Sequence, residues 1–240
     1  MNFGRALVEP FPFKPQQKTM RASSFIPICL LFFTTLQGAT ILDFESPLPS
    51  GLIAANHTHL ATAPSSSVIG DKFADVGVIF SGATLLNLGN GSTASGVNGF
   101  GGLDNLGRFD SGAPITLSFV SPFDSNVLAT TDYVSLVADP LNASDNTVTI
   151  SAYGISGNLL STVIYNEPAP VFGSSAPIVF SGIGQIHSIV IDPTLNEYST
   201  GNGGIQFDLL TFETLVVPEP SRTCLLGIFF FACILRRNRR

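Results

Sequence analysis

Cysteine is scarce in this 240-residue chain, and its three copies avoid the central part. Cys29 lies in an apolar stretch near the start, and Cys224 and Cys233 lie in another near the end. The body between Thr40 and Val217 therefore has no thiol. This absence excludes a disulfide, a thiol nucleophile and a cysteine-based zinc site from the body.

Basic residues are almost as rare in the same body. Fifteen carboxylates stand there against only Lys72 and Arg108, a balance of −13 that the whole-chain charge of −6 conceals. Such a surface repels phosphate groups, so nucleic acid is not expected as a partner, and cations are better candidates. Tryptophan is absent altogether. Because sugar-binding platforms use aromatic faces, this absence weakens the case for sugar binding.

Helical periodicity is also missing, since no ten-residue stretch of the body combines it with a helix cap. Short apolar or alternating runs recur instead, separated by Gly, Asn, Asp and Pro. In residues 147–153 valine, isoleucine and alanine fall on one face and hydroxyls on the other. The runs are residues 41–45, 76–80, 84–88, 115–120, 133–137, 147–153, 159–165, 178–180, 187–191 and 205–212.

This pattern predicts an all-β fold, an antiparallel β-sandwich and specifically a jelly roll of eight to ten strands. The glycine-rich residues 89–102 lack the lysine and the strand–helix context of a phosphate-binding loop, and we expect a long flexible loop there. We place the sandwich domain at residues 40–215, which is enough chain for one domain with a substantial core.

Residues 1–39 are expected to be an N-terminal extension and a signal peptide. Met20 and Arg21 open a basic segment, an apolar stretch follows at residues 25–33, and Ala39 is a suitable cleavage point. Because Met20 stands where a signal peptide should begin, we expect it to be the true start.

The last part of the chain, residues 216–240, has three components. Pro218 and Pro220 stop any strand or helix. The apolar run at residues 224–235 would form a helix about 18 Å long, which is short for a bilayer core of about 30 Å. Basic residues then hold the end on the cytoplasmic side: Arg236, Arg237, Arg239 and Arg240. We therefore expect an exported body attached to the membrane by a single short C-terminal transmembrane helix.

This order of motif, apolar helix and arginine cluster resembles the PEP-CTERM sorting signal of bacterial exported proteins, which is also labelled an ice-binding protein C-terminal domain. The motif comprises Val217, Pro218, Glu219, Pro220 and Ser221. The resemblance implies recognition by exosortase, a membrane-embedded cysteine protease. It also implies a protein tethered at the inner membrane during processing and then found at the cell surface or outside the cell.

A second resemblance concerns the body. The run at residues 41–45, the hairpin at 147–165 and the runs at 182–191 and 205–212 are similar to jelly-roll domains related to carbohydrate-binding modules. Such modules often hold a structural calcium ion. Here Asp43 and Glu45 on the first strand and Asp208 on the last are the candidate ligands, if terminal strands pair. The alternative is that these carboxylates simply face solvent, opposite Leu42 and Phe44.

Catalytic patterns are weak. The body has no Gly-x-Ser-x-Gly elbow, and His57 and His59 have no visible third zinc ligand. Glu167 and Glu197 are expected in loops and do not form an assignable pair for glycoside hydrolysis. We expect a non-enzymatic surface or extracellular-matrix protein with a structural or adhesive role, which would bind exopolysaccharide if it binds a glycan. The alternative is a secreted hydrolase that acts on polysaccharide.

Overall fold

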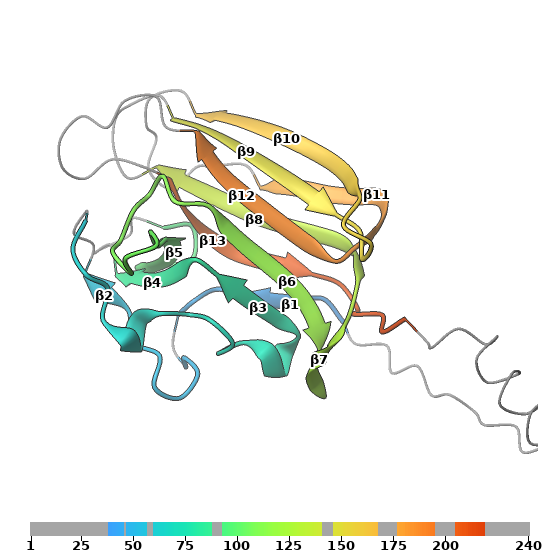
Figure 1. Cartoon of the computed structure of the whole chain (residues 1–240), viewed down its shortest axis with the longest axis horizontal. Coiled ribbons are helices and arrows are strands. Elements are labelled where there is room, and N and C mark those ends of the chain that lie inside the picture. Colours follow the sequence, from blue (N-terminus) through green and yellow to red (C-terminus); the bar gives the residue numbers. More distant parts are fainter. Residues whose placement is uncertain are drawn as a thin grey trace, which may run out of the picture. The chain divides into compact units, whose positions relative to one another are not determined.

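Two β-sheets stack on each other in the part of the chain that the structure describes (Figure 1). The structure is a computed structural model, and it describes residues 38–45, 47–56, 60–87, 93–140, 146–167, 177–194 and 205–218. Two short 3₁₀ helices, η1 (Ser65–Ser67) and η2 (Ala74–Val76), lie ahead of the third strand. No helix in these ranges is long and apolar enough to cross a membrane. The predicted apolar tail at 224–235 and the predicted signal peptide up to Gln37 lie outside the described residues.

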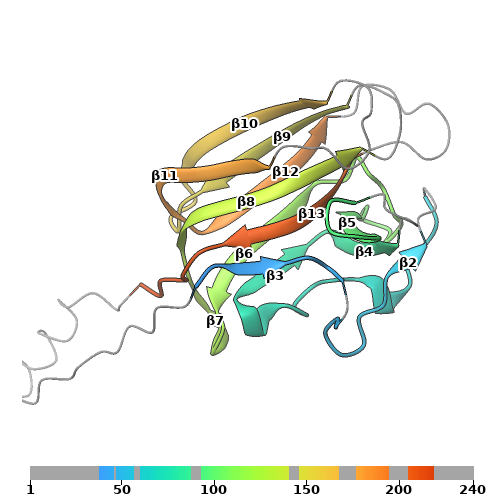
Figure 2. The same cartoon turned by 180° about the vertical axis from the view of Figure 1, so that it is seen from behind.

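The larger sheet has seven strands in the order β11-β8-β13-β5-β4-β2, with β1 paired to β13. All of its pairs are antiparallel except β2 with β4. Its strands are β1 (Thr40–Leu42), β2 (Ala55–Asn56), β4 (Ala83–Asn87), β5 (Asn98–Gly102), β8 (Thr131–Pro140), β11 (Ile178–Ile186) and β13 (Ile205–Phe212). Figure 2 shows β1 beginning and β13 ending at the same end of this sheet.

The smaller sheet has six strands in the order β10-β9-β12-β6-β3, with β7 paired to β6. Every pair in it is antiparallel. Its strands are β3 (Val78–Ser81), β6 (Ile115–Ser121), β7 (Asp124–Leu128), β9 (Asn146–Tyr153), β10 (Leu159–Glu167) and β12 (Ser188–Thr194). The predicted all-β sandwich is confirmed at this level, and each of the ten predicted runs overlaps a strand.

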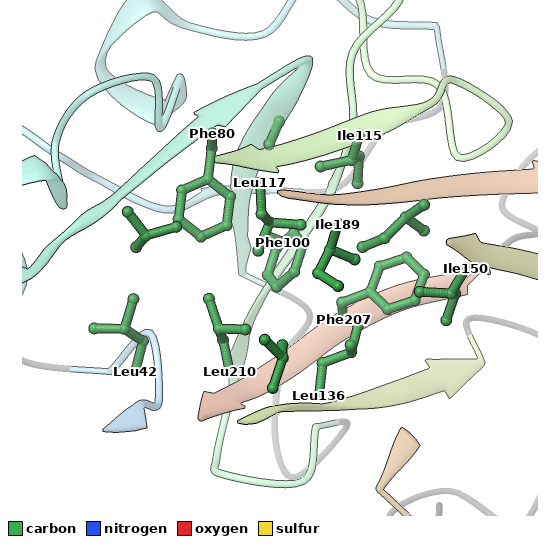
Figure 3. Close-up of a cluster of buried hydrophobic side chains, with 14 of the residues drawn as sticks. Leu42, Phe80, Phe100, Ile115, Leu117, Leu136, Ile150, Ile189, Phe207 and Leu210 are labelled. Atoms are coloured by element: carbon green, nitrogen blue, oxygen red, sulfur yellow. The ribbon is translucent and has the colours of Figure 1, made fainter. Parts of the chain in front are cut away.

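The core fills the space between the sheets with alternate residues of their strands. On β9, Val148, Ile150 and Ala152 are fully buried, as the two-residue period predicts. Figure 3 shows side chains of both sheets meeting in one cluster, among them Phe80, Ile115, Leu117, Ile150 and Ile189 of the smaller sheet and Phe100, Leu136, Phe207 and Leu210 of the larger one.

Phe44 is an aromatic hub in this core. Its ring centroid lies 5.0 Å from that of Phe100, 5.7 Å from Phe73 and 6.0 Å from Phe80. The contacts with Phe73 and Phe80 are edge-on, the geometry that aromatic pairs prefer. Its backbone has a φ of 58°, which L-residues rarely adopt. The predicted strand at 41–45 therefore ends at Leu42, because a left-handed residue cannot continue the ladder.

The prediction of a flexible loop at residues 89–102 is wrong for its last five residues. Asn98–Gly102 is β5, a strand buried along its whole length between β13 and β4. A Cβ at Gly102 would lie 2.5 Å from the Ala113 carbonyl oxygen, and one at Gly101 would lie 2.7 Å from the Phe109 ring. Glycine is present here because neighbouring groups approach the backbone closely, and the conformational freedom of glycine is not the reason.

Two further strands were not predicted, and two breaks were placed wrongly. β2 has two residues and β7 is exposed along its length, so neither has an apolar face to reveal it. Glu167 ends β10 and is not in a loop. Pro193 lies within β12, although the predicted run ended at residue 191. The β6 ladder stops at Ile191, so Pro193 has only β9 as a neighbour and removes no hydrogen bond with β6.

We predict that Phe44→Ala lowers the free energy of unfolding by about 3–5 kcal/mol, because it leaves a cavity among three rings. Chemical denaturation monitored by circular dichroism measures the change. Phe123→Ala is the matched control, since Phe123 is 92% exposed and should change stability little. Equal losses in the two variants would contradict the role of Phe44 as a hub.

Candidate functional site

The predicted calcium ligands meet one segment of chain, residues 93–98, which precedes and begins β5. Asp208 lies on β13 and is fully buried. Its Oδ2 accepts a hydrogen bond of 2.7 Å from the Ser95 backbone N–H, and its Oδ1 accepts one of 2.7 Å from the Leu209 N–H. Burial raises the pKa of the Asp208 carboxyl, and hydrogen bonds from Ser95, Leu209 and Thr93 offset part of that rise.

Glu45 binds the same segment further along the chain. Its Oε1 accepts hydrogen bonds from the backbone N–H groups of Val97 (2.7 Å) and Asn98 (2.8 Å). Its Oε2 accepts one of 3.0 Å from the Asn98 amide nitrogen, which also donates to the Phe44 carbonyl oxygen at 3.1 Å. A Cβ at Gly96 would lie 2.7 Å from Oε1 of Glu45, so any side chain there would displace this carboxylate.

Asp43 takes part mainly through its backbone. Its carbonyl oxygen accepts a hydrogen bond of 2.7 Å from the Ser95 hydroxyl. Its exposed carboxylate accepts one of 3.1 Å from the Glu45 N–H and so closes its own turn. We call this set of contacts of Asp43, Glu45 and Asp208 with residues 93–98 the carboxylate clasp.

The clasp brings the three predicted residues to one region, where the carboxylates of Glu45 and Asp208 face N–H donors. The described residues contain no group of three or more His, Cys, Asp or Glu side chains that could hold a metal ion. Calcium requires carboxylate and carbonyl oxygens, and the carboxylates of Glu45 and Asp208 already accept hydrogen bonds from the backbone. This geometry does not fit a calcium centre. Calcium binding stays a prediction, which melting curves with calcium and with a chelator would test.

Other predicted residues fall in different places. Val217 and Pro218 are exposed at the end of the described chain. The rest of the predicted sorting motif and basic anchor lies outside the described residues: Glu219, Pro220, Ser221, Arg236, Arg237, Arg239 and Arg240. His57, His59 and Glu197 lie outside them as well.

Sequence reasoning missed the ion pair that holds one of the two basic residues of the body. Arg108 Nη2 lies 2.6 Å from Oδ2 of Asp104, and Arg108 Nε donates to the same oxygen at 2.7 Å. The backbone N–H of Arg108 donates to Oδ1 of Asp104, and this contact contributes most to lowering the pKa of Asp104. The four-residue spacing of Asp104 and Arg108 was the available signal. Outside a helix, this spacing indicates an ion pair only when the turn between the two residues is known.

A second candidate surface is the outer face of the six-stranded sheet, which lies toward the viewer in Figure 1. Its residues alternate with the buried ones along β3, β6, β9, β10 and β12, and they align in unbroken register from β9 through β12 and β6 to β3. We call it the hydroxyl face. Nine of its side chains carry hydroxyls and one carries a carboxylate: Ile79, Ser81, Thr116, Ser118, Thr147, Thr149, Ser151, Tyr153, Thr162, Ile164, Asn166, Ser188, Val190 and Asp192.

The hydroxyl face is chemically different from the rest of the body. Asp192 is its one carboxylate, whereas the whole body has fifteen. Neighbouring side chains hydrogen-bond across strands, as Ser151 does with Thr162 at 3.1 Å and Thr147 with Asn166 at 2.9 Å. An array of donors and acceptors with a single charged group suits an uncharged, polyhydroxylated partner better than an ionic one.

No protein-family model matches this sequence, and no curated protein matches it. Three solved structures superpose on it weakly. The K1 cleaved adhesin domain of Lys-gingipain from Porphyromonas gingivalis is 10% identical, with 74% of this chain and 99% of that chain covered and a TM-score of 0.35. A DUF4465 family protein from Bacteroides caccae is 13% identical, with 76% of this chain and 100% of that chain covered and a TM-score of 0.37.

The third structure is isomalto-dextranase of Arthrobacter globiformis complexed with panose. It is 14% identical, with 75% of this chain and 33% of that chain covered and a TM-score of 0.33. TM-scores this low carry no argument about fold or function.

We predict that Asp208→Asn costs about 1–3 kcal/mol of unfolding free energy, because an amide NH₂ would then face one of two N–H donors. The raised pKa means that the folded protein binds this proton more tightly than the unfolded chain does. The contribution of Asp208 to the free energy of unfolding is therefore largest when the pH is below 3.8, the ordinary pKa of an aspartate. It falls as the pH rises through the raised pKa of the folded protein.

Urea unfolding across the acid range measures the difference in unfolding free energy between the wild type and Asp208→Asn. This difference should narrow as the pH rises. Asp192→Asn is the matched control, since Asp192 is an exposed carboxylate on a strand. A gap that is independent of pH would show that burial does not determine the behaviour of Asp208.

Proposed function

We propose that this is a non-enzymatic, exported cell-surface or extracellular-matrix protein, with a jelly-roll body that exosortase sorts through the motif at residues 217–221. One structural observation supports the proposal. β1 and β13 pair, with Thr40 opposite Phe212. The expected points of signal-peptide removal and of tail removal are therefore attached to neighbouring strands at one end of the body.

This arrangement suits a domain that is tethered and then released. Val216 pairs with Thr130 and Val217 is exposed, so the chain reaches the surface at the start of the sorting motif. A protease acting there would cut an accessible segment without breaking a strand. The body would keep both sheets after release, because the last strand ends at Phe212.

The role proposed for the released body is structural or adhesive, with an extracellular polysaccharide as its ligand. The hydroxyl face supports this choice, because it combines uncharged hydrogen-bonding groups with one aromatic side chain, Tyr153. The strongly acidic remainder of the body would repel anionic polymers, so the proposed ligand is a neutral glycan.

Mass spectrometry of the protein recovered from cells and medium of the source organism tests the sorting. We expect an N-terminus near Thr40 and a C-terminus between Val217 and Ser221. A chain that still ends at Arg240 would contradict processing by exosortase.

A glycan array combined with an assay for released sugars tests the role. We expect binding of a neutral glycan without turnover, weakened about tenfold by Ser151→Glu, which places a charge in the middle of the hydroxyl face. Ser181→Glu, on the exposed side of β11, is the control and should leave binding unchanged. Release of sugar products would favour the hydrolase instead.

A further inference from the structure

The strand β10 forms one edge of the six-stranded sheet and is long and regular. It has nine residues, and within the described ranges it pairs with β9 alone. Its one irregularity is a register shift between Leu159 and Ser161, so residues 161–167 form an unbroken ladder with β9. Figure 2 shows β10 as the outermost strand of its layer. An edge of this kind is a template for pairing with another strand.

The other sheet edges are blunted in ways that β10 is not. β2 has only two residues and β3 has four. β11 is as long as β10, but its register shifts between Ser181 and Ile186, and Gly182 and Gly184 there have φ values of 65° and 109°. Short strands and bulges prevent edges from pairing between molecules. Only β10 of these four edge strands lacks such a feature along seven consecutive residues.

The β9–β10 hairpin also has no charge. Residues 147–166 contain no Asp, Glu, Lys or Arg, although the body has a net charge of −13. Residues 159–165, Leu-Leu-Ser-Thr-Val-Ile-Tyr, combine β-branched, aromatic and aliphatic side chains without proline or glycine. This composition is typical of segments that pair strand to strand between molecules. The usual protection by a lysine or proline at the edge is absent from this segment.

We propose that β10 pairs in antiparallel orientation with β10 of a second copy of this chain, around a twofold axis at Ile164. Ile164 is the midpoint of the regular residues 161–167, so this register overlaps them completely. Thr162 of each copy then lies opposite Asn166 of the other. The pair joins two six-stranded sheets into one continuous sheet, and a twofold contact of this kind closes without forming a fibre.

A second copy suits this edge because residues 162–166 of both strands are uncharged and, in the proposed register, lie opposite one another. The two bodies are both strongly acidic and repel each other, and the charge-free hairpin is where that repulsion is weakest. In the proposed register the two Glu167 residues lie about 20 Å apart at opposite ends of the pair. The half-buried Leu160 and Val163, which pack against the core, also gain cover from the neighbouring strand.

This inference goes beyond the proposed sorting and ligand and does not depend on either. The test is sedimentation equilibrium of the full chain in a density-matched detergent at about 100 µM. We expect twice the monomer mass for wild type and the monomer mass for Ile164→Lys, whose ammonium groups would meet at the axis. Ile164 is 62% exposed, so lysine should not disturb the fold, and circular dichroism checks this.

Val179→Lys is the matched control, because Val179 is an exposed β-branched residue on the edge strand β11 and should leave the dimer intact. A monomeric wild type, a dimeric Ile164→Lys, or loss of the dimer in both variants would overturn the proposal.

Crosslinking in a background with Cys29, Cys224 and Cys233 changed to serine gives an independent measurement. Under a mild oxidant, Ile164→Cys should form a disulfide-linked dimer. Thr116→Cys, in the middle of the same sheet, should not, and a crosslink there would mean that faces rather than edges meet.

Discussion

The packing of Phe44 against three other phenylalanines is the contact on which this body depends most. Phe44 follows the first strand in a left-handed conformation, which turns the chain away from the sheet and places the ring in the core. Phe80 comes from the smaller sheet and Phe100 from the larger, so the hub joins both layers. Burial of this ring compensates for the backbone strain, which costs of the order of 1–3 kcal/mol.

The carboxylate clasp lies directly beside that hub. Phe44 stands between Asp43 and Glu45, so the same three residues that place a ring in the core place two acceptors against residues 93–98. Asp208 on β13 completes the contact from the neighbouring strand. The clasp therefore holds the approach to β5 in place, and β5 carries Phe100 into the hub. Core and clasp are in this way parts of one structural unit.

The strands were predictable wherever one side of the sequence had to be buried. The alternation in residues 147–153 located β9 because hydroxyls and aliphatic groups cannot exchange faces. β5 was not predictable, since its glycines read as a loop and their reason lies in the carbonyl oxygens and rings around them. The gathering of Asp43, Glu45 and Asp208 was anticipated from the pairing of the terminal strands. Their N–H partners were not, because Ser95 lies 113 residues away from Asp208 in the chain.

The sequence by itself determined the all-β class and the acidic and cysteine-free character of the body. These follow from composition and local period, which need no knowledge of neighbours in space. Tertiary structure alone decided which carboxylates are buried, which glycines are needed and which strand remains at an edge. Each of these depends on groups that are distant in the chain and become neighbours only when the sheets form, so no local pattern records them.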